Sequence, residues 1–176
     1  LLGLDYVYLC FDVNEETLPA AVAGLKTCGI RGFNLTMPNK NKIVELLDEL
    51  SPEAQLIGAV NTVLNDNGKL IGYNTDGYGF MQSVRDAGHD ITGKNITVMG
   101  VGGASMAICA QSALDGAASV HIFARRTSRY WNRTQKFAEN LSAKTGCQVC
   151  LFDNDDHTAL RNSIAQSYLL INATSV

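Results

Sequence analysis

The chain has 176 residues, and its 14 lysines and arginines against 17 aspartates and glutamates give a formal net charge of −3. Hydrophobic residues make up 46% of it and charged residues 18%, which excludes an intrinsically disordered chain. The absence of a basic excess argues against nucleic-acid binding, and no apolar run approaches the roughly 18 residues that cross a membrane. The sequence begins with Leu1 rather than Met and shows no signal peptide, so we expect part of a longer cytoplasmic protein.

Five cysteines are scattered through apolar stretches, namely Cys10, Cys28, Cys109, Cys147 and Cys150. Their odd number and their positions indicate reduced, mostly buried thiols in a cytoplasmic protein. Cys147 and Cys150 have the spacing of a metal-binding or redox pair, but no second pair of ligands stands at a suitable distance in the sequence. We therefore expect no metal site.

Strand and helix periodicities alternate along the first half of the chain. Leu18, Val22 and Leu25 fall on one face of a helix that Gly29 ends, and residues 65–68 have the composition of a hairpin turn. The expected elements are strands at residues 6–11, 30–35, 60–64 and 69–73, and helices at residues 15–28, 41–50 and 76–87, with a further helix beginning at residues 51–53.

The second half has a more regular pattern, which begins after a polar stretch at residues 89–94. We expect strands at residues 95–99, 120–123, 147–152 and 168–172, and helices at residues 105–115, 129–144 and 158–165. Strands that alternate with helices predict right-handed βαβ units and a parallel sheet. The fold class is therefore α/β, with a boundary that separates residues 1–88 from residues 89–176.

A glycine-rich turn follows the first strand of the second half. Gly100 permits a tight turn, and Gly102 lets the backbone approach a pyrophosphate. Ser105 fills the third glycine position of the G-x-G-x-x-G pattern with another small residue. A turn that only joins strand to helix is the alternative, but a helix that begins directly after the turn favours dinucleotide binding.

Arginines and hydroxyl side chains follow the next strand, at the place where a dinucleotide's adenosine ribose should lie. Arg125, Arg126, Thr127 and Ser128 offer hydrogen-bond donors there, and no carboxylate is present for a ribose hydroxyl. This composition favours NADP over NAD, although a solvated basic loop is the alternative. Taken alone, Arg129 is interpreted as solvated.

Polar residues also gather at three strand ends in the first half, within residues 34–40, 58–62 and 72–77. Ligands bind open α/β sheets at the carboxyl ends of the strands. Taken alone, Lys40 has the simpler interpretation of an exposed lysine, and Asp76 that of a helix N-cap. Asp76 can cap and still present a carboxylate oxygen to a ligand.

Together these segments resemble the shikimate dehydrogenase family, including its quinate/shikimate dehydrogenase branch. The matching stretches are NLTMPNK, GAVNT, GYNTDG, GVGGAS and INATSV, which stand in the family's order between Asn34 and Val176. The resemblance implies an N-terminal α/β substrate domain at residues 1–88 and a Rossmann-like NAD(P)-binding domain at residues 89–176. It also implies that both are truncated, because the family's carboxylate-binding serines would precede Leu1 and its last helices would follow Val176.

The resemblance implies reversible, NADP-dependent reduction of 3-dehydroshikimate to shikimate in aromatic amino-acid biosynthesis, by a monomer or homodimer whose partners are small molecules. Lys40 would be the catalytic lysine with Asp76 as its partner, and Thr36, Asn61 and Asp76 would bind the ring hydroxyls. The implied cofactor contacts are Gly100, Gly102, Gly103 and Ala104 for the pyrophosphate, Arg125, Arg126 and Thr127 for the adenosine 2′ group, and Thr174 within residues 172–175 for the nicotinamide.

Asn39 departs from the family's pattern, and Thr127 bears on the choice of cofactor. Asn39 stands before the lysine where many members carry His, as in the quinate/shikimate branch, so quinate and NAD remain alternatives. Thr127 stands where some members of that branch place an Asp for NAD, which favours NADP. A dinucleotide-sensing module without turnover is the alternative from another class, but such a module has no need of both Lys40 and Asp76.

Overall fold

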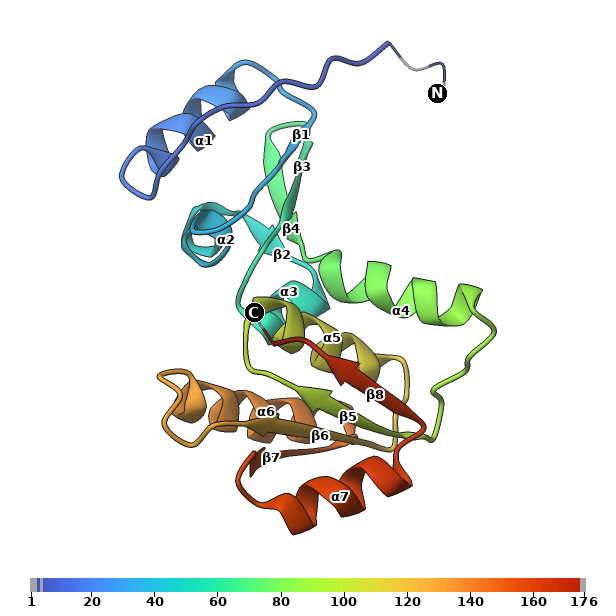
Figure 1. The fold of residues 1–176 in the computed structure, drawn as a ribbon. Helices are drawn as coiled ribbons and strands as arrows, with labels where there is room; N and C mark the ends of the chain where they lie inside the picture. Colours follow the sequence, from blue (N-terminus) through green and yellow to red (C-terminus); the bar gives the residue numbers. More distant parts are fainter. Residues whose placement is uncertain (1–2, 4, 175–176) are drawn as a thin grey trace.

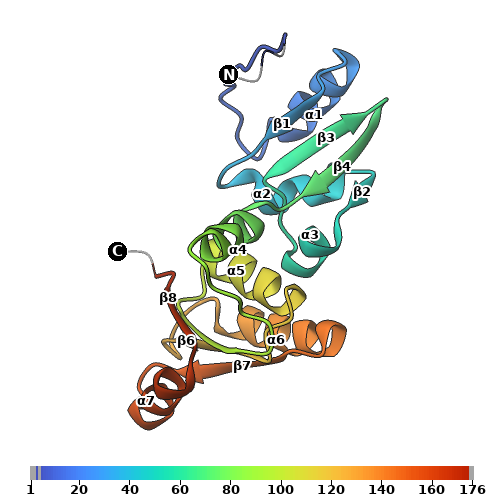
Figure 2. The ribbon, with the colours of Figure 1, turned by 90° about the vertical axis from the view of Figure 1, so that its right-hand side faces the viewer.

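The computed structural model describes residues 3 and 5–174 and contains two four-stranded sheets that follow one another along the chain (Figures 1 and 2). The first sheet has the order β1-β3-β4-β2, in which only β2 and β4 run parallel. Its strands are β1 (Gly32–Asn34), β2 (Glu49–Leu50), β3 (Thr62–Asp66) and β4 (Lys69–Tyr73). The helices of this half are α1 (Leu18–Thr27), α2 (Asn39–Lys42), the 3-10 helix η1 (Ile43–Leu46), α3 (Pro52–Ile57) and α4 (Asp76–Asp86).

Local chemistry explains where these elements turn and stop. Asn67 and Gly68 have φ values of 52° and 92°, which fits the two-residue turn expected between β3 and β4. The Ser51 side chain accepts a hydrogen bond from the Ala54 N–H and caps α3. Gly29 has a φ of 67° just after α1, as expected for a residue that ends a helix.

Two expectations in this half are wrong. Residues 6–11 form no strand, and Tyr6, Val7 and Phe11 are 68%, 82% and 63% exposed, because no described strand pairs with the segment. The helix expected at residues 41–50 ends earlier: Leu47 is extended, and β2 follows. Asp48 accounts for the change, since its carboxylate accepts the Leu70 N–H at 2.8 Å and draws this segment beside β4.

The second sheet is entirely parallel, as the alternating pattern predicts, with the order β7-β6-β5-β8. Helices α5 and α6 pack on one face of it and α7 on the other (Figure 1). Its strands are β5 (Asn95–Met99), β6 (Ser119–Ala124), β7 (Gln148–Asp153) and β8 (Leu169–Asn172), and its helices are α5 (Gly103–Leu114), α6 (Trp131–Thr145) and α7 (His157–Gln166).

A network of hydroxyl groups lies between the second sheet and α7. Thr97 is fully buried, and its hydroxyl lies 2.6 Å from that of Ser163 and 2.5 Å from that of Ser167. His121 Nδ1 also contacts the Ser163 hydroxyl, at 2.9 Å. Burial lowers the pKa of His121, because a charged imidazolium would lose solvation there.

The first half contributes helices to the core of the second. Helices α3 and α4 both lie beside α5 (Figure 2). Ile57 of α3 and Met81 and Val84 of α4 belong to the buried cluster that covers the second sheet. Helix α4 crosses α5 so closely that a Cβ atom added at Gly77 would lie 2.2 Å from the Ala107 carbonyl oxygen. Only glycine fits at this crossing without movement of a helix.

All five cysteines are free, but the expectation that most of them are buried holds only for Cys109 and Cys147, since Cys10 and Cys28 are exposed. Burial raises the pKa of the Cys109 thiol to about 12. Among the described residues, no helix combines the length and the hydropathy that crossing a membrane requires.

Candidate active site

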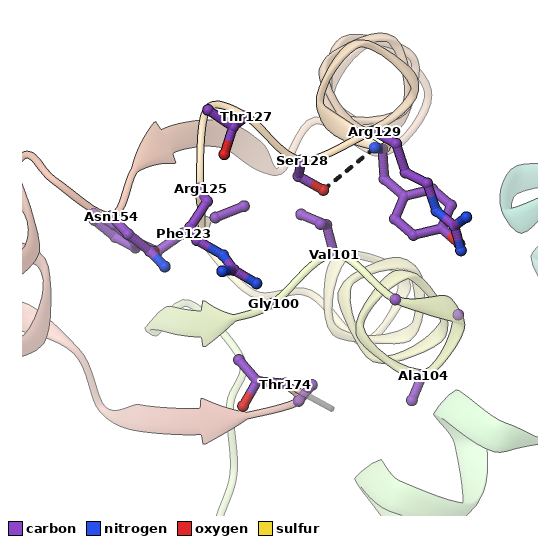
Figure 3. A pocket seen from close by; sticks show the side chains of 15 residues that line it. Gly100, Val101, Ala104, Phe123, Arg125, Thr127, Ser128, Arg129, Asn154 and Thr174 are labelled. Atoms are coloured by element: carbon purple, nitrogen blue, oxygen red, sulfur yellow. Dashed lines mark hydrogen bonds between the residues drawn. The ribbon is translucent and has the colours of Figure 1, made fainter. Parts of the chain in front are cut away.

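A cavity of about 720 Å³ opens at the carboxyl ends of the second sheet's strands (Figure 3). Its walls come from the turns after β5 and β6, from the residue after β7 and from the segment after β8. The lining residues are Gly100, Val101, Gly102, Gly103, Ala104, Phe123, Ala124, Arg125, Thr127, Ser128, Arg129, Tyr130, Asn154, Ala173 and Thr174. All four glycine-turn residues implied for a pyrophosphate are among them.

The glycine turn is shaped for an anion. Gly100 has a φ of 107°, and a Cβ atom there would lie 2.7 Å from the Ala173 carbonyl oxygen, so the turn requires glycine. The Ser105 hydroxyl donates to the Gly100 carbonyl at 2.6 Å and holds the turn against α5. The N-cap residue of α5 is Gly102, which has no side chain to cap the helix, so the first N–H groups of α5 lie at the cavity's edge without a helical partner. These donors and the helix dipole fit a pyrophosphate.

The arginine cluster divides between the cavity and the surface. Arg125 and Arg129 line the cavity, and both are exposed, so Arg129 is solvated as well as placed at the cavity wall. The Arg129 guanidinium stacks over the Tyr130 ring, with 4.7 Å between guanidinium carbon and ring centroid. Arg126 is not among the lining residues, and its guanidinium lies over the Trp131 ring at 5.2 Å. The sequence pattern could not separate these orientations, because all three arginines occupy one loop.

A second constellation forms where three polar strand ends of the first half meet. Lys40 Nζ donates to Asp76 Oδ2 at 2.7 Å, and the two side chains are 22% and 39% exposed. Asn61 Nδ2 donates to the other carboxylate oxygen of Asp76 at 2.8 Å. The Thr75 N–H in turn donates to Asn61 Oδ1 at 3.0 Å, which fixes the amide orientation. A lysine and a carboxylate in direct contact can move a proton and orient a hydroxylated ligand.

A family model for the shikimate dehydrogenase substrate-binding domain matches residues 1–63. The shikimate dehydrogenase (NADP(+)) of Listeria innocua is 50% identical over 175 residues, which cover 99% of this chain and 60% of that relative. Over 99% of its length, the chain is therefore similar to shikimate dehydrogenases. The resemblance drawn from the five motifs is thereby confirmed.

Solved structures give the same result. The shikimate 5-dehydrogenase of Listeria monocytogenes, in complex with shikimate and NAD, is 49% identical with a TM-score of 0.96 and aligns with 99% of this chain and 60% of its own. The quinate dehydrogenase of Corynebacterium glutamicum, in complex with NAD, is 28% identical with a TM-score of 0.76 over 89% of this chain and 54% of its own. The chain thus spans about 60% of the length of the shikimate dehydrogenases it matches.

Asp76 does not act as the helix cap that its position suggested. It is the first residue of α4, and the preceding Thr75 occupies the cap position without a side-chain hydrogen bond to the helix. The Asp76 N–H instead donates to Asn74 Oδ1 at 3.2 Å. The Asp76 carboxylate therefore remains directed at Lys40 and Asn61, and the positive end of α4 favours its charge.

Two other residues of the NLTMPNK stretch face the N-terminal segment. Thr36 lines a different cavity, of about 480 Å³, between β1 and the segment before α1. Asn39 is buried, and its Nδ2 donates to the Val13 carbonyl at 2.7 Å. The asparagine that stands in place of the frequent His therefore packs against the N-terminal segment, although it directly precedes Lys40.

At the opposite edge of the cofactor cavity, Thr174 donates from its backbone N–H and its hydroxyl to Asn172 Oδ1, at 3.1 and 2.6 Å. Thr174 lines the cavity, whereas Ser175 lies outside the described residues. Asn154 is a lining residue that the sequence pattern did not single out, since residues 153–156 have the composition of an acidic turn.

Proposed function

We propose that the protein interconverts 3-dehydroshikimate and shikimate with NADP, as a step of aromatic amino-acid biosynthesis. The observation that carries this proposal is the contact between Lys40 and Asp76 at 2.7 Å, in a chain that also has a dinucleotide-shaped cavity. The name of the Listeria innocua relative supports the reaction and the cofactor. Because the chain spans about 60% of such relatives, the activity is proposed for the complete protein.

The chain's own residues account for the proton in this reaction. The nicotinamide supplies the hydride to the ring carbon, or accepts it in the reverse direction. Lys40 in its ammonium form gives a proton to the substrate oxygen as the carbonyl becomes an alcohol, and the neutral amine takes that proton back in the oxidation. Asp76 holds the Lys40 amine and accepts hydrogen bonds from a ring hydroxyl, while Asn61 fixes the Asp76 carboxylate.

We assign the remaining site residues either to the substrate or to the cofactor. Residues 1–88 would bind the substrate, with Thr36, Asn61 and Asp76 on its hydroxyls, and residues 89–176 would bind the cofactor. The proposed cofactor contacts are the glycine turn with Ala104, Arg125 and Thr127 of the basic segment, and Thr174, whereas Arg126 of the same segment lies over the Trp131 ring and outside the cavity lining. We infer a cytoplasmic enzyme, monomeric or homodimeric, that has no nucleic-acid or membrane partner.

NADP is favoured because the β6 turn offers Arg125, Thr127 and Arg129 to the cavity and no carboxylate among its lining residues. NAD with quinate is the second candidate, supported by the Corynebacterium glutamicum relative and by Asn39 in the lysine motif. Both cofactors use the same glycine turn, so only the ribose contacts distinguish them.

Turnover measurements on the complete protein test this proposal. Absorbance of the reduced nicotinamide is followed with shikimate or quinate, each with NADP⁺ or NAD⁺. Fast turnover of shikimate with NADP⁺ alone supports the proposed reaction, whereas comparable rates with quinate or NAD⁺ support the second candidate. No turnover in any of the four combinations would contradict both and support a dinucleotide-sensing module.

Lys40→Ala is the matching variant, with Lys42→Ala as its control. Lys42 lies on the same helix and, within the described part of the chain, pairs only with the exposed Glu45, so its removal should leave turnover unchanged. Lys40→Ala should lower kcat by roughly 10²- to 10⁴-fold, the usual contribution of a general acid or base, and leave the cofactor Kd unaltered. Equal kcat values for the two variants would contradict the catalytic role of Lys40.

A further inference from the structure

The order of the strands indicates which part of a dinucleotide reaches which turn. The strands of the second sheet lie side by side in the order β7-β6-β5-β8. The glycine turn follows β5, and the arginine turn follows β6. A pyrophosphate at the first turn and a ribose at the second extend the molecule toward β7. The next group along that line is the adenine base, and the first residue after β7 is Asn154.

The turn after β7 does not depend on the side-chain amide of Asn154. Its backbone N–H donates to the Ala124 carbonyl at 2.9 Å, and Asp153 Oδ1 accepts the N–H of Asp155, so the turn is held without the amide. Asp156 caps α7 by accepting the Ala159 N–H at 2.9 Å. Among the described residues, Asn154 Oδ1 is buried and meets no hydrogen-bond donor.

An unpartnered amide oxygen is unfavourable in a protein interior, because it loses its water without gaining a donor. Figure 3 shows the Asn154 side chain directed toward Arg125, within the wall of the cavity. Rotation about the terminal torsion of asparagine exchanges its oxygen and nitrogen at little cost, since that torsion is broad. A ligand in the cavity can therefore meet either end of the amide.

We propose that Asn154 recognises the adenine base of the cofactor, an inference that rests on the proposed dinucleotide function. Its Oδ1 accepts a hydrogen bond from the 6-amino group, and its Nδ2 donates to a neighbouring ring nitrogen. Asparagine pairs with adenine in this bidentate way wherever the two edges meet in plane. Asn154 is then a specificity residue for the base, whereas the arginine turn acts on the ribose.

Equilibrium binding to the complete protein without substrate tests the assignment. Isothermal titration calorimetry compares NADP⁺ with etheno-NADP⁺, in which a two-carbon bridge joins the 6-amino nitrogen to N1 and removes the 6-amino N–H that Asn154 Oδ1 would accept. The unmodified protein should bind NADP⁺ about tenfold more tightly than the etheno form, the effect of one or two neutral hydrogen bonds. Asn154→Ala should weaken NADP⁺ binding about tenfold and bind the two dinucleotides equally. Asn162→Ala, on the exposed face of α7, should match the unmodified protein.

An Asn154→Ala variant that keeps both the NADP⁺ affinity and the preference over the etheno form would overturn the proposal. Absence of any dinucleotide binding to the unmodified protein would overturn it together with the cofactor assignment. The proposed reaction can fail independently. In that case NADP⁺ binding and the preference over the etheno form would be normal, but neither shikimate nor quinate would be turned over.

Discussion

Gly77 is the position at which a single methyl group should disturb both stability and catalysis. In Gly77→Ala, the new Cβ would stand 2.2 Å from the Ala107 carbonyl oxygen, 2.8 Å from its carbon and 3.0 Å from Gln111 Cβ. Real Cβ atoms do not approach closer than 3.0 Å, so α4 and α5 must separate by about 0.8 Å. Overpacking of this kind costs about 1–3 kcal/mol, because the obstacle is backbone and cannot rotate away.

The same displacement moves Asp76, which directly precedes Gly77 at the start of α4. A shift of about 1 Å in a catalytic group costs up to roughly 10²-fold in rate, so the kcat of Gly77→Ala should fall within that range. Denaturant unfolding measures the first effect and steady-state turnover the second, both on the complete protein.

Gly79→Ala is the matched control, since it lies two residues further along α4 and its added Cβ meets nothing within 4 Å. Exchange of glycine for alanine in a helix interior stabilises by about 1 kcal/mol, so this variant should be at least as stable as the unmodified protein. If Gly77→Ala matches Gly79→Ala in both stability and kcat, the reasoning about the helix crossing is refuted.

Three further predictions concern local features. Burial lowers the pKa of His121, so on acidification this histidine is protonated in the unfolded chain before it is protonated in the folded protein. The free energy of unfolding should therefore decline as the pH falls below about 6.5. Urea unfolding between pH 7 and 5 should show a smaller decline for His121→Gln. A thiol reagent should modify exposed Cys28 in the native protein but reach buried Cys109, whose pKa is raised to about 12, only on unfolding; equal rates would contradict this. Ser51→Ala should cost about 1 kcal/mol through loss of the α3 cap, whereas Ser51→Gly should cost a few tenths, and equal losses in thermal unfolding would argue against capping.

Most of the second sheet could be predicted from its sequence, because each strand and helix there has its own hydrophobic periodicity and its own terminating residues. The strand expected at residues 95–99 coincides with β5, and the other elements differ only at their ends. The strand at residues 6–11 failed for a different reason. An apolar run shows that a segment can pair, but pairing needs a neighbouring strand, which local sequence does not specify.

In the candidate site, too, some features could be predicted from local sequence and others depend on tertiary structure. Glycine spacing depends on backbone sterics, so the turn at Gly100 could be located from the order of residues alone. Which arginine faces the cavity depends on how aromatic rings hold Arg126 and Arg129, a matter of tertiary packing. Asn154 was missed because its significance comes from the strand order, which brings the β7 turn beside the β6 turn although α6 and β7 separate the two along the chain.

The contribution of α3 and α4 to the second core has a topological consequence. Helix α3 precedes the β3–β4 hairpin and α4 follows it, yet Ile57 and Met81 are buried in the same cluster against the second sheet. The hairpin therefore lies between two helices that reach the second core, and α3 is shared by both cores, since its Ala54 is buried in the first. No single chain break separates the two cores, so a chimera between relatives keeps both intact only if it exchanges two segments at once.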